Sequence, residues 1–221
     1  GYVEDGFYDN EAEVRADPFY ANESPSKVKS MVGQVKYKNM DEDPVIDDRD
    51  KAIIGNTNPD YQYGLTNTVT YQQWTFSFFM QGTQGNDILN ANLLPFDLVG
   101  SNNMPKNVWD TRWTSENRDI ARWPRPDNTY TRSMKASDRY VKDGSYLRCK
   151  NISLSYKWMN PINYVESINL TASVSNFFTI TNYDWYDPDV NSFGSDASRR
   201  GVDLSSYPSA RSFNLGIQLS F

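Results

Sequence analysis

Apolar and polar residues alternate without interruption over residues 212–221, at the end of the chain. Successive side chains of a β-strand point to opposite faces, so the pattern predicts a strand with one apolar and one polar face. A shift of a single residue would exchange the two faces, and no such shift occurs here. The apolar face carries Phe213, Leu215, Ile217, Leu219 and Phe221.

The same period of two recurs upstream in residues 61–71, 74–81, 151–158 and 167–177. Only Gln72 and Gln73 separate the first two of these segments, so we expect a tight hairpin there. Residues 145–149 run out of phase with the strand that follows them. A β-bulge near Lys150 and Asn151, or emergence of the strand from a membrane at that point, would account for the change of phase.

The polar faces of these segments favour a transmembrane β-barrel. A single segment of this kind is typical of a half-buried strand in a soluble sandwich. Together, however, the segments carry hydroxyl, amide and glycine residues instead of the charged mixture that soluble surfaces favour. Aromatic residues also lie where the strands should end, as in the interfacial girdles of membrane barrels. They are Tyr61, Tyr71, Trp74, Tyr156, Trp158, Phe177 and Phe178.

The connections between the predicted strands also fit a barrel. Residues 72–73 and 159–166 form short turns, whereas residues 82–144 and 179–210 form long connections. Outer-membrane barrels alternate short periplasmic turns with long extracellular loops. With Phe221 at the periplasmic end of the last strand, both short turns fall on the periplasmic side and both long loops fall outside.

Composition narrows the class of protein. The chain of 221 residues is 38% apolar and 14% aromatic, with a mean hydropathy of -0.72. No apolar run approaches the roughly 18 residues that a spanning helix needs. A net charge of -6 argues against nucleic acid as a partner. The single cysteine excludes an internal disulfide framework.

The chain has the residues of few catalytic sites. It contains no histidine, which removes the Ser-His-Asp triad and imidazole metal sites. The acid pairs Asp47-Asp48 and Asp187-Asp189 lie in predicted loops, and the sequence shows no further residues that would complete a catalytic site with them. We therefore expect no enzymatic activity.

Short strings of residues along the chain carry a family resemblance. They include Gly1-Tyr2, Val35-Lys36-Tyr37, Ile53-Ile54-Gly55-Asn56, Asn58-Pro59-Asp60, Gly85-Asn86-Asp87-Ile88, Arg112-Trp113-Thr114, Gly144-Ser145-Tyr146-Leu147-Arg148, Asn176-Phe177-Phe178-Thr179, Asp187-Pro188, Tyr207-Pro208 and the terminal Phe221. In this order and spacing they resemble the SusC/RagA family of TonB-linked outer-membrane transporters of Bacteroidetes-type bacteria.

The resemblance implies a fold. Members of the family are antiparallel transmembrane β-barrels of about 22 strands, plugged by an N-terminal domain and bearing long extracellular loops. The chain is accordingly predicted to be all-β and to supply the C-terminal strands of such a barrel. We expect residues 1–59 to form an extracellular loop region and residues 60–221 to form strands and loops. About five full strands cannot close a barrel, so further polypeptide would be needed to complete it.

The resemblance also implies a function: TonB-dependent import of oligosaccharide or peptide across the outer membrane of a Gram-negative bacterium. The implied partners are a SusD-like surface lipoprotein, membrane lipid and TonB, the last through an N-terminal part that the chain lacks. The apolar face from Phe213 to Phe221 would also be the signal read by the barrel-assembly machinery. The alternative from another class is a soluble carbohydrate-binding β-sandwich module. A passive porin is disfavoured by the family strings.

An acidic loop at residues 39–50 matches the ligand spacing of a calcium loop. Family members often carry such a string at this place. The candidate ligands are Asn39, Asp41, Asp43, the carbonyl of Val45, Asp47 and Asp50. Asn39 replaces the usual leading acid, and Pro44 stands where a glycine normally makes the sharp turn. Calcium is thus the candidate cofactor, and a solvated acidic loop is the alternative.

Aromatic residues of the two long connections are candidates for contacts with cargo or with the lipoprotein. Exposed aromatic rings can stack on sugar rings, whereas packing within a folded loop is the alternative for each residue. The candidates are Trp109, Trp113, Trp123, Tyr183, Trp185 and Tyr186.

Overall fold

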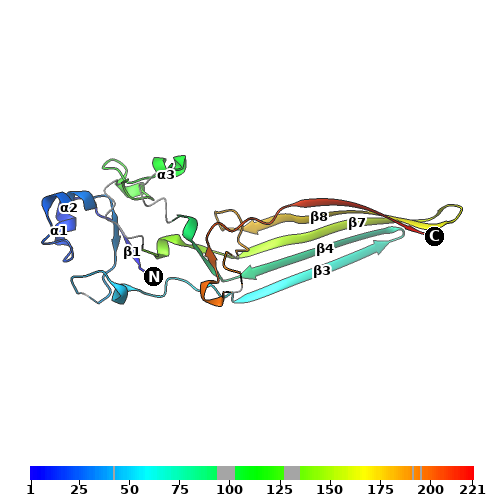
Figure 1. The fold of residues 1–221 in the computed structure, drawn as a ribbon, viewed down its shortest axis with the longest axis horizontal. Helices are drawn as coiled ribbons and strands as arrows, with labels where there is room; N and C mark the ends of the chain where they lie inside the picture. The colour runs from blue at the N-terminus through cyan, green and yellow to red at the C-terminus, as the bar shows by residue number, and fades with distance from the viewer. Residues whose placement is uncertain (42, 94–102, 127–134, 191, 195) are drawn as a thin grey trace. The chain divides into compact units, whose positions relative to one another are not determined.

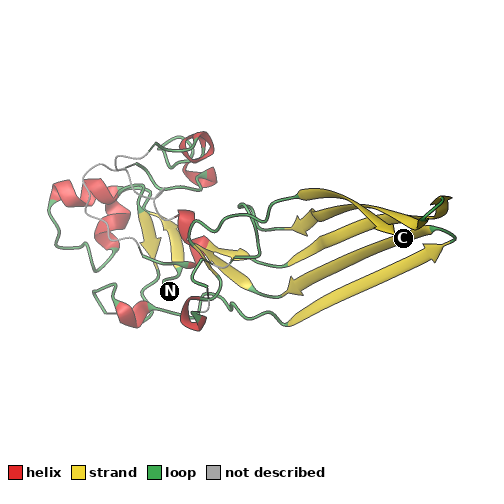
Figure 2. Cartoon of the chain, turned by 45° about the vertical axis from the view of Figure 1, so that its right-hand side comes forward, coloured by secondary structure: helices red, strands yellow, loops and turns green. Residues whose placement is uncertain are grey.

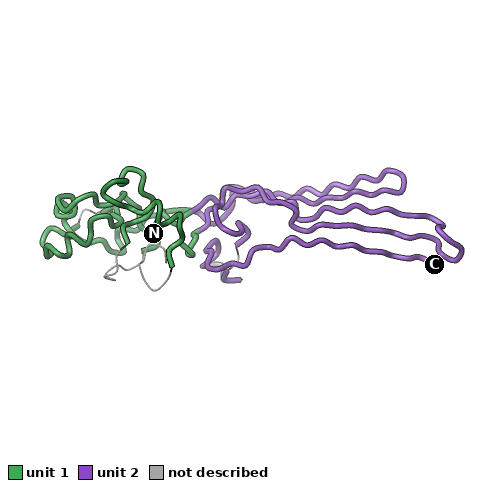
Figure 3. The backbone as a smooth tube through the Cα atoms, turned by 90° about the horizontal axis from the view of Figure 1, so that it is seen from above, with its two compact units in different colours: residues 1–55, 89–141 green, residues 56–88, 142–221 purple. Residues whose placement is uncertain are grey.

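The computed structural model describes residues 1–41, 43–93, 103–126, 135–190, 192–194 and 196–221. The chain forms two compact units, which are described separately. Unit 1 comprises residues 1–55 and 89–141, and unit 2 comprises residues 56–88 and 142–221 (Figure 3). The predicted parts, residues 1–59 and 60–221, differ from these units in that residues 89–141 group with unit 1. The assignment of residues 1–59 to an extracellular loop region stays a prediction.

Unit 2 is built on a five-stranded antiparallel sheet with the order β10-β8-β7-β4-β3 (Figure 1). All five strands predicted from the alternation are present. They are β3 (Tyr61–Tyr71), β4 (Trp74–Gln84), β7 (Tyr146–Ile162), β8 (Val165–Thr181) and β10 (Ser212–Ser220).

The two short turns differ in how well the sequence predicted them. Gln72 and Gln73 connect β3 to β4 as expected, and Gln72 has the positive φ, 54°, of a tight hairpin. The second turn is tighter than the predicted residues 159–166. β7 continues to Ile162 and β8 begins at Val165, with Tyr164 at φ 75°. A shift of register between Met159 and Ile162 lets the strands pair beyond the point where the alternation ends.

The predicted bulge is present in β7. The register shifts opposite Phe79 and Met80 on β4, and between Cys149 and Asn151 against β8. On β8 the irregularity includes Asn176, which has a positive φ of 51°. The bulge realigns the strand, so that Cys149 pairs with Phe178 and the apolar residues on both sides of it share one face.

Unit 1 contains short helices and a two-stranded sheet, none of which the alternation predicted. The strands are β1 (Glu4–Phe7) and β2 (Val35–Tyr37). Helices α1 (Glu11–Ala16) and α2 (Pro25–Met31) begin at the capping side chains of Asn10 and Ser24. Their buried faces meet in a small core of Tyr8, Val14, Val28 and Met31.

The remaining elements are short (Figure 2). Unit 1 also contains α3 (Lys106–Asp110) and the 3-10 turns η1 (Asp48–Asp50), η3 (Arg118–Ile120) and η4 (Asp138–Tyr140). A small sheet has the order β6-β5-β9, from Val141–Asp143, Asp87–Asn90 and Val202–Asp203, and η5 (Ala197–Arg199) precedes its last strand. Among the residues described, no helix is both long and apolar enough to cross a membrane.

Candidate functional site

One face of the five-stranded sheet is apolar along its whole width. The register places Val69, Phe76, Leu154, Ala172 and Leu215 in a single row across the strands. Leu215 is 89% exposed and Val69 is 56% exposed, so nothing in the described chain covers this face. The other exposed large side chains of the face include Leu65, Tyr71, Trp74, Trp158, Leu170, Phe213, Ile217 and Leu219.

The opposite face carries hydroxyl and amide groups. A row on this face consists of Thr68, Ser77, Ser153, Ser173 and Asn214. Neighbouring hydroxyl groups bond across the strands. The oxygens of Thr68 and Ser77 lie 3.3 Å apart, those of Thr70 and Thr75 3.2 Å, and those of Ser155 and Thr171 2.9 Å. The sheet thus separates an apolar surface from a hydrogen-bonding one.

Aromatic residues gather on the apolar face near the hairpin at residues 72–73. Trp74 pairs directly with Tyr156, with ring centroids 4.7 Å apart. Tyr71 and Trp158 are 71% and 51% exposed. Tyr61 begins β3 at the other end of the sheet, as the sequence predicted. The prediction that aromatic residues lie at strand ends is thus confirmed for the two strands β3 and β4. It is wrong for Tyr156, Trp158, Phe177 and Phe178, because β7 and β8 extend past them to Ile162 and Thr181.

Two of the six aromatic candidates in the long connections are buried. Trp113 is 6% exposed and its indole nitrogen donates a hydrogen bond of 3.3 Å to Asp9. Its ring lies so close to Gly33 that a Cβ there would come within 2.5 Å of it. Tyr183 is 4% exposed and donates a 2.6 Å hydrogen bond to Asp203. Burial and this bond raise the pKa of Tyr183 above its ordinary value.

The other four aromatic candidates are more accessible. Trp109 is 50% exposed, and the Arg112 guanidinium lies 3.5 Å from the centre of its ring. Tyr186 is 74% exposed beside Trp185, with ring centroids 5.1 Å apart. Trp123 is half-buried. The candidates with numbers from 109 to 123 belong to unit 1 and the rest to unit 2. A role in binding cargo or lipoprotein stays a prediction for all six.

Arg49 occupies the centre of the acidic loop. Its guanidinium forms ion pairs with Asp41 at 3.4 Å, with Asp47 at 3.0 Å, and with Asp43. Hydrogen bonds from the side chain and backbone of Arg49 lower the pKa of Asp47. The spacing of the acidic residues indicated the possible ligands, but it did not indicate that Arg49 would compete with a metal ion for them.

Two further candidate ligands of the loop, Asp50 and Asn39, also form hydrogen bonds. Asp50 is fully buried and accepts hydrogen bonds from the backbone nitrogens of Met40, at 2.8 Å, and Asp47, at 2.7 Å. The Asn39 amide donates to the carbonyl oxygen of Asp43. Among the described residues, no group of three acidic or thiol side chains is arranged to hold a metal ion. Calcium binding to this loop stays a prediction.

An ion pair that sequence reasoning missed connects β7 to the loop after β8. Arg148 is 2% exposed and pairs with Asp187. The same guanidinium donates to Thr179 at 2.8 Å and to Ser209 at 3.0 Å. Burial would raise the pKa of Asp187, but the bonds from Arg148 and from the backbone of Ser209 hold it below its usual value. The contacts fix the beginning and the end of the loop to one strand.

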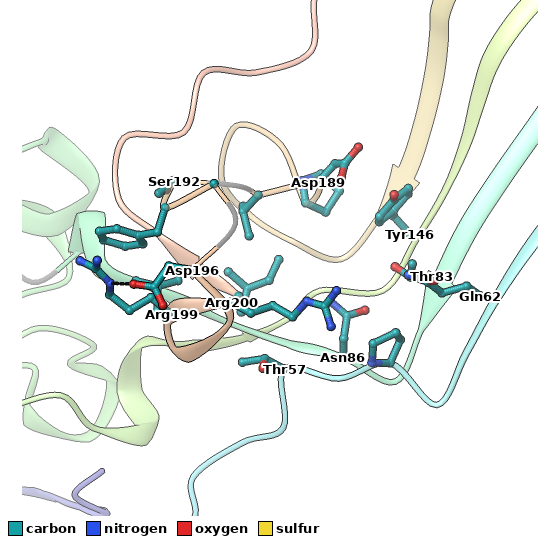
Figure 4. Close-up of a pocket in the computed structure, with 18 residues that line it drawn as sticks. Thr57, Gln62, Thr83, Asn86, Tyr146, Asp189, Ser192, Asp196, Arg199 and Arg200 are labelled. Carbon is teal, nitrogen blue, oxygen red and sulfur yellow. Dashed lines mark hydrogen bonds and ion pairs between the residues drawn. The ribbon is translucent and has the colours of Figure 1, made fainter.

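A cavity of about 500 Å³ lies within unit 2, where the sequence predicted no site (Figure 4). Gln62, Thr83 and Asn86 contribute neutral polar groups to its lining. Asp196, Arg199 and Arg200, around η5, contribute charged groups. The residues come from segments far apart in the sequence, which explains why no local pattern indicated the cavity.

Comparison with known proteins gives relatives over most of the chain. No protein-family model matches it. The TonB-dependent receptor P3 of Formosa agariphila is 31% identical over 195 residues, which is 84% of this chain and 19% of that protein. The receptor P26 of the same organism is 30% identical over 86% of this chain and 20% of its own length. TonB-dependent receptor SusC of Bacteroides thetaiotaomicron is 28% identical over 80% of this chain and 16% of its own.

Solved structures share the fold. The RagAB peptide importer in its 'open-open' state matches with a TM-score of 0.67 at 20% identity, over 87% of this chain and 21% of that chain. Its 'closed-closed' state matches with a TM-score of 0.64 at 19% identity, over 85% and 19% of the two chains. The chain thus spans about a fifth of the length of the proteins that it matches.

Proposed function

Because the chain is related over most of its length to SusC/RagA-like TonB-dependent transporters, we propose that it forms wall strands and outer loops of an outer-membrane nutrient importer. The relatives are named as receptors and transporters, and none of those cited is named as an enzyme. The resemblance indicated by the short sequence strings is confirmed by these relatives.

The single observation that carries the proposal is the two-faced sheet. Burying a large apolar side chain stabilises a protein by about 1.5–3 kcal/mol relative to leaving it in water. The row from Val69 to Leu215, and the rows beside it, leave many such side chains exposed. Lipid on this face would remove them from water. The hydroxyl face would then line the aqueous interior of a barrel.

The edges of the sheet support the same assignment. Within the described chain, β3 and β10 are the outermost strands and have no further strand beside them. An open strand edge inside a bilayer leaves backbone groups without hydrogen bonds, at several kcal/mol for each group. Further strands of a longer polypeptide, closing a barrel of about 22 strands, would pair with both edges.

A soluble carbohydrate-binding β-sandwich fits less well. Such a module would need a second sheet packed on the apolar face. The exposures of Leu215 at 89% and Ile217 at 73% indicate that the described chain supplies no such cover.

The proposed cargo is an oligosaccharide or a peptide, and the proposed partners are a SusD-like surface lipoprotein and TonB. The names of the matched proteins support a transporter acting with TonB: they include SusC and the peptide importer RagAB. Contact with TonB would involve a part of the polypeptide outside this chain. The accessible loop residues Trp109 and Tyr186 are the proposed contacts for cargo or lipoprotein.

The proposal can be tested with two substitutions at adjacent positions of β7 in the full-length protein. Leu154→Lys places a charge on the apolar face, whereas Ser153→Lys places it on the hydroxyl face. In a membrane barrel the first should cost about 2–4 kcal/mol near the bilayer midplane and the second far less. We expect L154K alone to deplete the protein from the outer-membrane fraction and to abolish uptake. Equal amounts of both variants in a detergent-free soluble fraction would contradict the proposal.

A further inference from the structure

Among the described residues around the cavity of unit 2, Arg200 has no ion-pair partner. Asp196 pairs with Arg199 at 2.7 Å, and the Arg199 guanidinium also lies 4.2 Å from the centre of the Phe193 ring. Asp189 pairs with Lys150 at 3.3 Å. Arg200 forms no ion pair or hydrogen bond with the described residues. Its side chain extends toward the wall of the cavity that contains Asn86 (Figure 4).

The backbone beside Arg200 is held in place. Gly201 has a φ of 73°, and a Cβ there would lie 2.6 Å from the Thr57 side chain. The Asp196 carboxylate accepts a 3.0 Å hydrogen bond from the Ser198 nitrogen and so caps η5, which ends just before Arg200. A cation on a fixed backbone is suited to recognition, because little conformational freedom is lost when an anion binds.

The rest of the lining offers neutral hydrogen-bonding groups. The side-chain oxygens of Thr83 and Asn86 have no hydrogen-bond partner in the described part of the protein. Buried polar atoms seldom lack a hydrogen-bond partner, and a molecule bound in the cavity would supply one to each of these oxygens. Gln62, Tyr146 and Ser192 add further polar atoms to the cavity. Besides the paired charges of Asp189, Asp196 and Arg199, the lining thus offers neutral polar groups and the cation of Arg200. This combination suits a ligand rich in hydroxyl groups that carries a negative charge.

We propose that the cavity binds a saccharide bearing an oxyanion, with Arg200 pairing with its carboxylate or sulfate group. The volume, about 500 Å³, lies within the usual range for ligand sites of roughly 300–1,000 Å³. The inference rests on the proposed transport function and refines it, since it assigns an acidic sugar to a defined place on the importer.

The test measures binding to the purified full-length protein by calorimetry. The first probes are a galacturonic acid tetramer and the methyl ester of that tetramer, in which methyl groups remove the negative charge and leave the hydroxyl groups unchanged. A sulfated oligosaccharide of the same length separates sulfate from carboxylate recognition. The variants are Arg200→Gln, Arg200→Lys and, as a control, Arg211→Gln, an exposed arginine that does not line the cavity.

We expect wild-type protein and R211Q to bind at least one of the acidic sugars more tightly than the ester. R200Q should weaken that binding by about tenfold or more and leave binding of the ester unchanged, and R200K should retain most of it. Equal binding of acid and ester by wild type, absence of binding to every acidic sugar, or wild-type affinity in R200Q would each overturn the site. If an acidic peptide bound in a manner that depends on Arg200, and the acidic sugars did not bind, the assignment of a saccharide as ligand would be overturned.

The two proposals fail differently. If uptake of neutral cargo by whole cells depends on the gene but acidic sugars show no dependence on Arg200, only the anion site is wrong. If deletion of the gene leaves uptake of every oligosaccharide and peptide tested unchanged, the transport function is wrong as well.

Discussion

Arg148 of β7 and Asp187 of the loop after β8 form an ion pair in which the side chains are only 2% and 6% exposed. The pair joins residues 39 positions apart in the sequence. Breaking a buried pair by removing one partner leaves an uncompensated charge, which typically costs about 3–5 kcal/mol.

Replacement Arg148→Met should therefore destabilise the loop strongly. We expect earlier thermal unfolding of the full-length protein in detergent and faster proteolysis within residues 182–211. Lys142→Met is the matched control, because Lys142 pairs with the exposed Asp184 and should contribute about 0–1 kcal/mol. Equal protease resistance of R148M and K142M would show that the pair does not hold the loop.

The same pair predicts a dependence of loop stability on pH. The pKa of Asp187 in the folded protein lies below its usual value. Its contribution to stability is therefore fully present above the unfolded pKa, near 3.9, and is lost as the pH falls through the lower folded pKa. Proteolysis by an acid-active protease should accelerate below about pH 4 in the wild type. Asp187→Asn should be cleaved readily at neutral pH and show a much weaker acceleration.

The buried and exposed aromatic residues of unit 1 should respond differently to truncation. Trp113→Ala is expected to cost about 3–5 kcal/mol, because the indole packs beside Gly33 and bonds to Asp9. Trp109→Ala should leave the unfolding temperature nearly unchanged. A loss of cargo or lipoprotein binding in W109A without a loss of stability would support its predicted role, and unaltered binding would remove it from the interface.

Calcium binding to residues 39–50 requires the carboxylates to exchange Arg49 for the metal. We expect Arg49→Ala to strengthen calcium binding by roughly tenfold, because it removes a competing positive charge from three carboxylates. Asp43→Asn in the R49A background should weaken it again. If calorimetry detects no heat of binding at calcium concentrations below the millimolar range, in either the wild type or R49A, the prediction of a calcium site is wrong.

The sheet was predictable because its information is local. Alternation reports which face a residue occupies, and five segments gave the five strands and the position of the bulge. The ends of β7 and β8 were missed because Met159 and Pro161 do not follow the alternation.

The loops were less predictable, because their structure depends on contacts between distant residues. Nothing near Trp113 reveals that Gly33 leaves space for its ring, and nothing near Arg148 reveals Asp187 or Ser209. Arg49 is part of the predicted calcium loop, but the calcium pattern is defined by oxygen ligands alone and therefore did not indicate a competing arginine. The short helices of unit 1 carry too few turns for a periodic signal, although Asn10 and Ser24 are recognisable caps.

The length of β7 and β8 determines how far these strands would extend beyond a bilayer. Each has 17 residues and so extends about 56 Å at roughly 3.3 Å per residue. A tilted strand crosses the hydrocarbon layer with about 9–11 residues. If the end near the hairpin at residues 163–164 lies at the periplasmic surface, the residues at the opposite ends of both strands lie outside the lipid. In the proposed barrel, Arg148 and the cavity beside Tyr146 would then lie on the part of the sheet that extends beyond the membrane, so that a ligand would meet protein before it reached the plane of the lipid.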